Sequence, residues 1–170
     1  MVTTADVKAL REATGAGVMD AKRALEDASG DFEAAKAIIQ QQGLASAAKR
    51  ADRETNQGIV TAYTHPAGKG GGRIGAMVEL NCETDFVANT DDFKNLAHNI
   101  TMQIAAMNPI YIDMDSNPEK IDDENPNKDN SLLSQQFIKD NEKSIKDLIE
   151  ETSGKLGEKI EVKRFQRFSI

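Results

Sequence analysis

Hydrophobic and polar residues alternate between Arg73 and Leu80, and this period of two is typical of a half-buried β-strand. The apolar side chains of the segment fall on one face: Ile74, Ala76, Val78 and Leu80. An earlier segment, 58–64, is rich in β-branched residues and predicts a second strand. The glycine-rich stretch 65–72 between them predicts a hairpin loop.

A helical pattern replaces the alternation soon after this strand. Asn89 or Thr90 can cap a helix whose first turn carries two aspartates, matching the positive end of the helix dipole. Its apolar residues recur on one stripe: Phe93, Leu96, Ile100, Ile104 and Met107. Residues 84–87 therefore occupy a corner between a strand and a helix, where an apolar side chain can be held out for a partner. Phe86, next to the charged Asp85, is the candidate, although a phenylalanine is more often buried in its own sheet.

Before the strands, short amphipathic segments separated by glycines predict a small three-helix bundle. The first helix begins at Thr3 or Thr4 and ends at Gly15. The second runs over about 18–28. It presents two larger and two smaller apolar residues to the bundle: Met19, Leu25, Ala21 and Ala24.

The third helix of the bundle can be capped by Asp31 and is expected to end before Gly43. Residues 44–51 then predict a short, basic, alanine-rich helix. Residues 52–56 would connect it to the strands. The change from helical to alternating periodicity beyond this point indicates a change of architecture.

The segment 108–131 holds three of the four prolines and seven acidic residues against two lysines. Such a composition is poor at building a core and predicts a loop. Segments 132–138 and 145–151 are expected to be helical.

A closing strand begins at Ile160 and Val162. Phe165 and Phe168 fit the same strand only if it twists or bulges. Together these patterns predict an α+β fold, in which a helical bundle precedes a small antiparallel three-stranded sheet packed with helices.

The chain of 170 residues carries a formal net charge of −7, which argues against direct nucleic-acid binding. Its single cysteine excludes an intramolecular disulfide framework and suits a reducing compartment. We find no signal peptide and no apolar run near the roughly 20 residues of a membrane span. We therefore expect a cytoplasmic protein that does not enter a membrane.

Side chains suited to covalent chemistry are few. The two histidines, His65 and His98, do not have the spacing of a metal site. Cys82 has no base nearby in sequence and ends a buried strand, which favours an inert thiol. We expect no metal, no cofactor and no catalysed covalent step.

The string from Val78 to Val87 is the most specific one in the chain, and it closely resembles the signature of the elongation factor Ts family. Residues 7–25 are similar to the N-terminal domain of that family, which is itself similar to ubiquitin-associated (UBA) domains. Segments 135–140 and 154–168 are similar to further strings of the family. The resemblance thus extends over nearly the whole chain.

The resemblance implies two domains. Residues 1–54 would form a UBA-like bundle with a basic connecting helix, and residues 55–170 the core and dimerisation domain. It also implies a guanine nucleotide exchange factor that binds elongation factor Tu, both loaded with GDP and free of nucleotide, and promotes exchange of GDP for GTP without covalent catalysis.

The family pattern also implies which residues meet the partner. Those expected to disturb magnesium and phosphate binding are Thr84, Asp85, Phe86 and Val87. Further contacts are implied at Lys22, Arg50, Leu156 and Gly157. The turn formed by the last two is implied to lie beside the Asp85–Phe86 corner.

Longer family members carry a second core repeat, which is missing here. We therefore expect a homodimer that pairs through the exposed face of the sheet. A rival interpretation is an adaptor, in which the bundle binds a peptide or a ubiquitin-like fold and the α+β part only dimerises. Release of a fluorescent GDP analogue from elongation factor Tu would separate the two.

Overall fold

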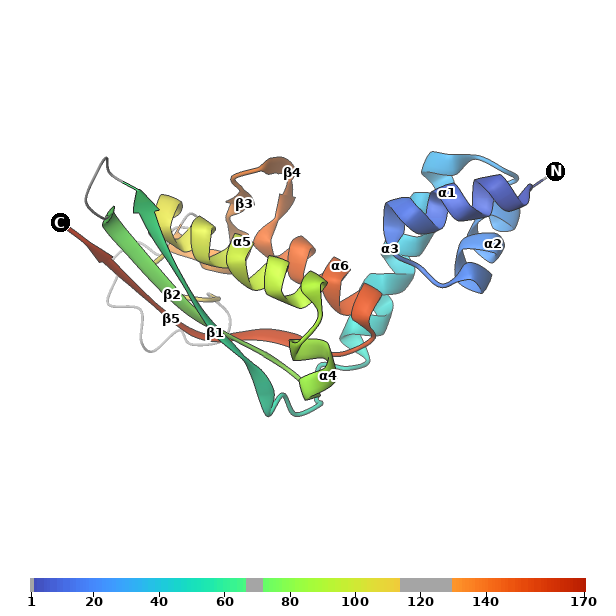
Figure 1. The fold of residues 1–170 in the computed structure, drawn as a ribbon. Coiled ribbons are helices and arrows are strands. Elements are labelled where there is room, and N and C mark those ends of the chain that lie inside the picture. The colour runs from blue at the N-terminus through green and yellow to red at the C-terminus, as the bar shows by residue number, and fades with distance from the viewer. Residues whose placement is uncertain (1, 67–71, 114–129) are drawn as a thin grey trace.

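Three helices open the chain in the computed structural model, which describes residues 2–66, 72–113 and 130–170. They are α1 (Thr4–Thr14), α2 (Val18–Asp27) and α3 (Phe32–Ala48). These helices pack around a small core of their own, formed by Leu10, Ala21, Ala24, Leu25 and Ala35. The group lies at one end of the molecule, and the C-terminus lies at the other (Figure 1).

The ends of these helices follow the local sequence closely. The Thr3 hydroxyl accepts from Asp6 N at 3.2 Å while the Asp6 carboxylate accepts from Thr3 N at 2.9 Å, which makes a capping box. Gly15 ends α1 in the left-handed conformation, with φ at 71°. The Asp31 carboxylate caps α3 by accepting from Ala34 N at 2.9 Å.

Two expectations for the bundle are wrong. Met19 is exposed and does not pack beside Leu25, because the inward face of α2 is set by the spacing of Ala21, Ala24 and Leu25.

The second error is the expected end of the third helix, since α3 continues through Gly43 to Ala48. The predicted separate helix over 44–51 is therefore the last part of α3 and the turn after it. A glycine inside a helix costs about 1 kcal/mol. Here α3 crosses α6 at this glycine, and a β-carbon at Gly154 would lie 3.5 Å from Gly43 Cα. Packing of the two helices offsets the cost.

The remainder of the chain is α+β. Strands β1 (Gln57–Pro66), β2 (Gly72–Cys82) and β5 (Ile160–Ser169) form an antiparallel sheet in the order β1-β2-β5. Helix α5 (Asp91–Met107) covers one face of this sheet, and α6 (Ile145–Leu156) continues the helical layer toward the bundle (Figure 1). Their shared core includes Val78, Leu80, Phe93, Ile100, Ile104 and Ile145. The predicted α+β class and the three-stranded sheet are confirmed.

The closing strand contains the predicted irregularity. Glu79 pairs with Arg164 while Leu80 pairs with Val162, so Lys163 is an extra residue in β5. The bulge returns Phe165 to the half-buried side. Phe168 lies on the opposite side of the strand and is exposed.

Two further helical expectations need correction. Met107 is exposed, because α5 ends there and the chain turns away at Asn108, whose φ is 49°. The segment 132–138 is not an α-helix but contains the short 3₁₀ turn η3 (Leu132–Ser134) and the strand β3 (Gln136–Phe137), which pairs with β4 (Asp140–Ser144).

A buried glutamine of α5 explains the geometry of this hairpin. The Gln103 amide donates to Gln136 O at 3.0 Å and accepts from Ile138 N at 3.0 Å. These bonds satisfy backbone groups that an α-helix would otherwise have paired.

The centre of the predicted acidic loop, 114–129, and most of the predicted hairpin loop, 67–71, lie outside the described residues. The described ends of the acidic segment meet, since Ile110 N donates to Asn130 O at 2.8 Å. Within the described ranges, no helix combines the length and the apolar character needed to cross a bilayer.

Candidate functional site

The predicted corner is one short helical turn between the sheet and α5. Strand β2 ends at Cys82, and α4 (Asp85–Ala88) follows with Thr84 as its cap. The Thr84 hydroxyl accepts from Val87 N at 3.4 Å. Val87 and Ala88 are buried, so they anchor the turn to the core.

Phe86 is 81% exposed, the largest exposed fraction of any described phenylalanine. Asp85 beside it is also exposed. Of the four predicted corner residues, these two point into solvent, while Thr84 and Val87 turn inward and hold the backbone. The structure thus presents the ring as the sequence predicted, and its contact with a partner stays a prediction.

The turn after α6 lies beside this corner, as the resemblance implied. The carboxylate of Glu158 accepts three hydrogen bonds from it: Glu83 N at 3.1 Å, Thr84 N at 3.0 Å and the Thr84 hydroxyl at 2.6 Å. Leu156 packs half-buried against the core, and Gly157 is exposed with φ at 77°. A residue with a side chain would be strained in this conformation. Glycine has none, so the chain turns there at little cost in free energy.

A second carboxylate, that of Glu83, belongs to the corner and binds the turn after α6. Glu83 accepts from Lys159 N at 2.7 Å and from the Arg53 guanidinium at 3.2 Å. Burial of Glu83 opposes its ionisation, but the Lys159 hydrogen bond and the Arg53 charge outweigh burial and lower the pKa of the carboxyl. Glu83 is therefore held as an anion at the base of the corner.

Cys82 lies under the same corner. Its thiol is fully buried and donates to Thr84 O at 3.1 Å. Burial, with the neighbouring Glu158 charge, raises the pKa of Cys82 to about 11. The reactive thiolate is scarce at neutral pH, so the environment of this cysteine favours an inert thiol, as predicted.

The other predicted contact residues are spread along the molecule. Lys22 is exposed on α2, where its ammonium lies 3.7 Å from Glu26. Val18 and Met19, one helical turn or less away, are exposed apolar residues that the sequence had not singled out as a surface. Arg50 is half-buried and donates to Ser153 O at 3.2 Å, which ties the end of α3 to α6, and its contact with a partner stays a prediction.

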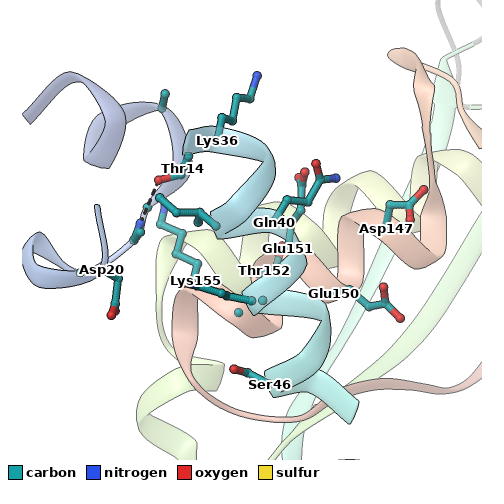
Figure 2. Close-up of a pocket in the computed structure, with 18 of the residues that line it drawn as sticks. Thr14, Asp20, Lys36, Gln40, Ser46, Asp147, Glu150, Glu151, Thr152 and Lys155 are labelled. Atoms are coloured by element: carbon teal, nitrogen blue, oxygen red, sulfur yellow. Dashed lines mark hydrogen bonds between the residues drawn. The ribbon is translucent and has the colours of Figure 1, made fainter. Parts of the chain in front are cut away.

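A cleft of about 580 Å³ separates the bundle from α6. Side chains of α3 and α6 line it from two sides (Figure 2). Two ion pairs lie among its charged side chains: Lys143 with Glu151 and Lys155 with Asp92, both at 2.8 Å. None of the four corner residues lines it, and the described residues contain no cluster of ligands suited to a metal ion.

Sequence reasoning missed Glu83 and Glu158 as supports of the corner. A signal was available, because one lies inside the most specific string and the other follows a turn glycine. Their pairing depends on a contact across 75 positions of chain, which local patterns do not encode.

Comparison with known proteins is consistent across the chain. The family model described as "Elongation factor TS" matches residues 8–127. The chain is 45% identical to elongation factor Ts of Moorella thermoacetica over 198 aligned positions, covering 100% of this chain and 96% of the relative. It is 46% identical to elongation factor Ts of Thermoanaerobacter sp. (strain X514), covering 99% of this chain and 94% of the relative.

The family model and these relatives define a translation elongation factor of the guanine nucleotide exchange class. The chain belongs to the elongation factor Ts family. The partner of this family is elongation factor Tu.

Proposed function

We propose that this protein releases GDP from elongation factor Tu by inserting the Asp85–Phe86 corner into its GTPase domain. The Phe86 ring would enter an apolar gap between two helices, and Asp85 would pair with polar groups nearby. The wedge favours a conformation in which magnesium and the phosphate-binding loop are disturbed, so GDP leaves faster. The observation that carries the proposal is the exposed Phe86 ring on an otherwise anchored turn.

The Phe86 ring alone could contribute a substantial part of the binding energy at this interface. One well-buried aromatic can supply about 2–4 kcal/mol of an interface. By linkage, the exchange factor and the nucleotide weaken each other equally. The ratio by which one lowers the affinity of elongation factor Tu for the other is the same in both directions. Since GDP and the protein oppose each other, GTP can bind next and expel the exchange factor.

We propose a second contact through the bundle, so that residues 1–54 and 55–170 act as two binding units. Val18, Met19 and Lys22 form an exposed surface at the start of α2. An apolar pair beside a cation suits the surface of a folded protein partner. The Leu156–Gly157 turn would add contacts next to the corner. Arg50 supports this arrangement indirectly, because its hydrogen bond joins the two units.

We also propose that two copies pair through the face of the sheet that no described helix covers. Three apolar side chains are exposed there: Val60, Met77 and Phe168. Glu79 and Arg164 lie on the same face, 2.6 Å apart, and a two-fold-related copy could pair these charges reciprocally.

The test is release of a fluorescent GDP analogue from elongation factor Tu, timed by stopped flow. Phe86→Ala should lower the maximal release rate by at least tenfold while the thermal unfolding midpoint stays unchanged. Ile110→Ala is a matched control, since Ile110 is an exposed apolar residue beyond the opposite end of α5. An unchanged rate for Phe86→Ala would refute the wedge and favour the adaptor.

A further inference from the structure

The backbone just before Phe86 is held from outside its own segment. Helix α4 has only four residues, so it cannot fix its own orientation. Glu83 N, Thr84 N and the Thr84 hydroxyl all donate to the one carboxylate of Glu158. Hydrogen bonds to an ionised acceptor are stronger than those between neutral groups.

The contact is double, because Glu83 binds the same turn in return. Its carboxylate accepts from Lys159 N at 2.7 Å, one residue after Glu158. Hydrogen bonds thus join the segments 83–84 and 158–159 at two points, and we call this pair of contacts the clasp. Twisting the corner away from its position would break several of these bonds at once.

The clasp stops where the exposed residues begin. Asp85 and Phe86 follow directly after Thr84, and Val87 is anchored behind them in the core. The direction of the Phe86 ring is therefore set by a fixed residue on either side.

We propose that Glu158 is a positioning residue for nucleotide exchange: its carboxylate keeps the 83–84 backbone in the conformation that presents Phe86 to the partner. This inference rests on the proposed wedge function. Without the carboxylate, the corner samples other conformations, and the apparent affinity falls by the fraction that remains competent. At saturation the partner selects the competent corner, so the maximal rate is preserved.

Variants of Glu158 separate the apparent affinity from the maximal rate of GDP release. Glu158→Ala should raise the half-saturating concentration for GDP release about tenfold and leave the maximal rate within about twofold. Glu158→Gln keeps one oxygen that can accept from both N–H groups, so it should recover most of the affinity. Glu151→Ala is a matched control on the preceding helix α6, because its carboxylate contacts Lys143 and not the corner. It should leave both quantities unchanged.

A spectroscopic signature reports the clasp directly. In Glu158→Gln the amide protons of Glu83 and Thr84 should shift upfield, because the charged acceptor has been replaced by a neutral one. If Glu158→Ala folds poorly, Thr84→Val provides a milder variant. It removes the hydroxyl donor at 2.6 Å and should shift the half-saturating concentration in the same direction by a smaller factor.

A double-mutant cycle decides the outcome. If Glu158 acts through Phe86, Glu158→Ala should have no further effect in the Phe86→Ala background. An equal loss in both backgrounds would overturn the positioning role and leave the wedge intact. A normal rate for Phe86→Ala alone would overturn the wedge, and the positioning role with it.

Discussion

The side chain of Lys155 lies directly against Gly15. A β-carbon at Gly15 would be 2.7 Å from both Cγ and Cδ of Lys155, closer than such atoms approach. Beyond this contact the Lys155 ammonium donates to Asp92 at 2.8 Å, at the start of α5. One lysine of α6 therefore touches both the bundle and the helix that follows the corner.

Gly15→Ala should destabilise the protein more than Gly30→Ala does. Both glycines have positive φ, 71° and 90°, which costs an alanine about 1–2 kcal/mol. Only at Gly15 does the new methyl group also displace Lys155, whereas nothing lies within 4 Å at Gly30. The excess should be about 0.5–1 kcal/mol, the worth of a partly exposed ion pair, measured by urea unfolding.

The double variant Gly15→Ala with Lys155→Ala checks the assignment. Relative to Lys155→Ala alone, the alanine at position 15 should cost the same as it does at position 30. A persistent excess would mean that the contact with Lys155 is not its cause.

Cys82 should be unreactive in the folded protein. Its thiol is fully buried, and its pKa of about 11 keeps the thiolate scarce at pH 8. Labelling by a chromogenic disulfide reagent should be at least a hundredfold slower than in urea-unfolded protein. Fast labelling under native conditions would show that the corner above Cys82 opens readily.

Acid should weaken the protein through Glu83. Its folded-state pKa lies below the ordinary glutamate value of about 4.3, so its stabilising effect is complete above pH 5 and is lost as the pH falls toward the lowered value. Glu83→Gln should be less stable than wild type at pH 7, and the gap should narrow by pH 3.

The measurement is the free energy of urea unfolding across this pH range. Glu26→Gln corrects for the change in net charge, because Glu26 is a well-exposed carboxylate paired with Lys22 on α2. A gap between Glu83→Gln and wild type that does not change with pH would contradict the assignment.

Met77→Glu should prevent the proposed pairing of two copies. Met77 lies in the middle of the sheet face that no described helix covers, and it pairs with Ala62 and Gln166. Two charges brought together at a two-fold interface would repel and lose hydration. Light scattering at micromolar concentration should give a dimer for wild type and a monomer for the variant. A wild-type monomer, alone and with the partner, would refute the pairing.

Local patterns predicted most elements of this fold. The alternation over 73–80, the caps at Thr3 and Asp31 and the bulge in the closing strand are confirmed, because each depends on neighbouring residues. The errors arise where tertiary contacts override local preference. Helix α3 passes Gly43 because α6 packs on it.

The candidate site likewise has features that local patterns predicted and features that depend on tertiary contacts. The exposure of Phe86 followed from its place at a corner between a strand and a helix. The contact that Glu158 makes could not be predicted from local patterns, since it joins segments that are brought together only by the closing of the sheet. The hydrogen bond from Arg50 to Ser153 likewise depends on the packing of α3 against α6.

The continuity of α3 has a consequence for selectivity. A helix of 17 residues is about 25 Å long and resists bending, and this one begins in the bundle and ends against α6. Under the proposed contacts, it fixes the separation between the start of α2 and the Phe86 corner. A related GTPase whose two matching surfaces were spaced differently could engage one of them but not both, so the length of a single helix would discriminate among partners.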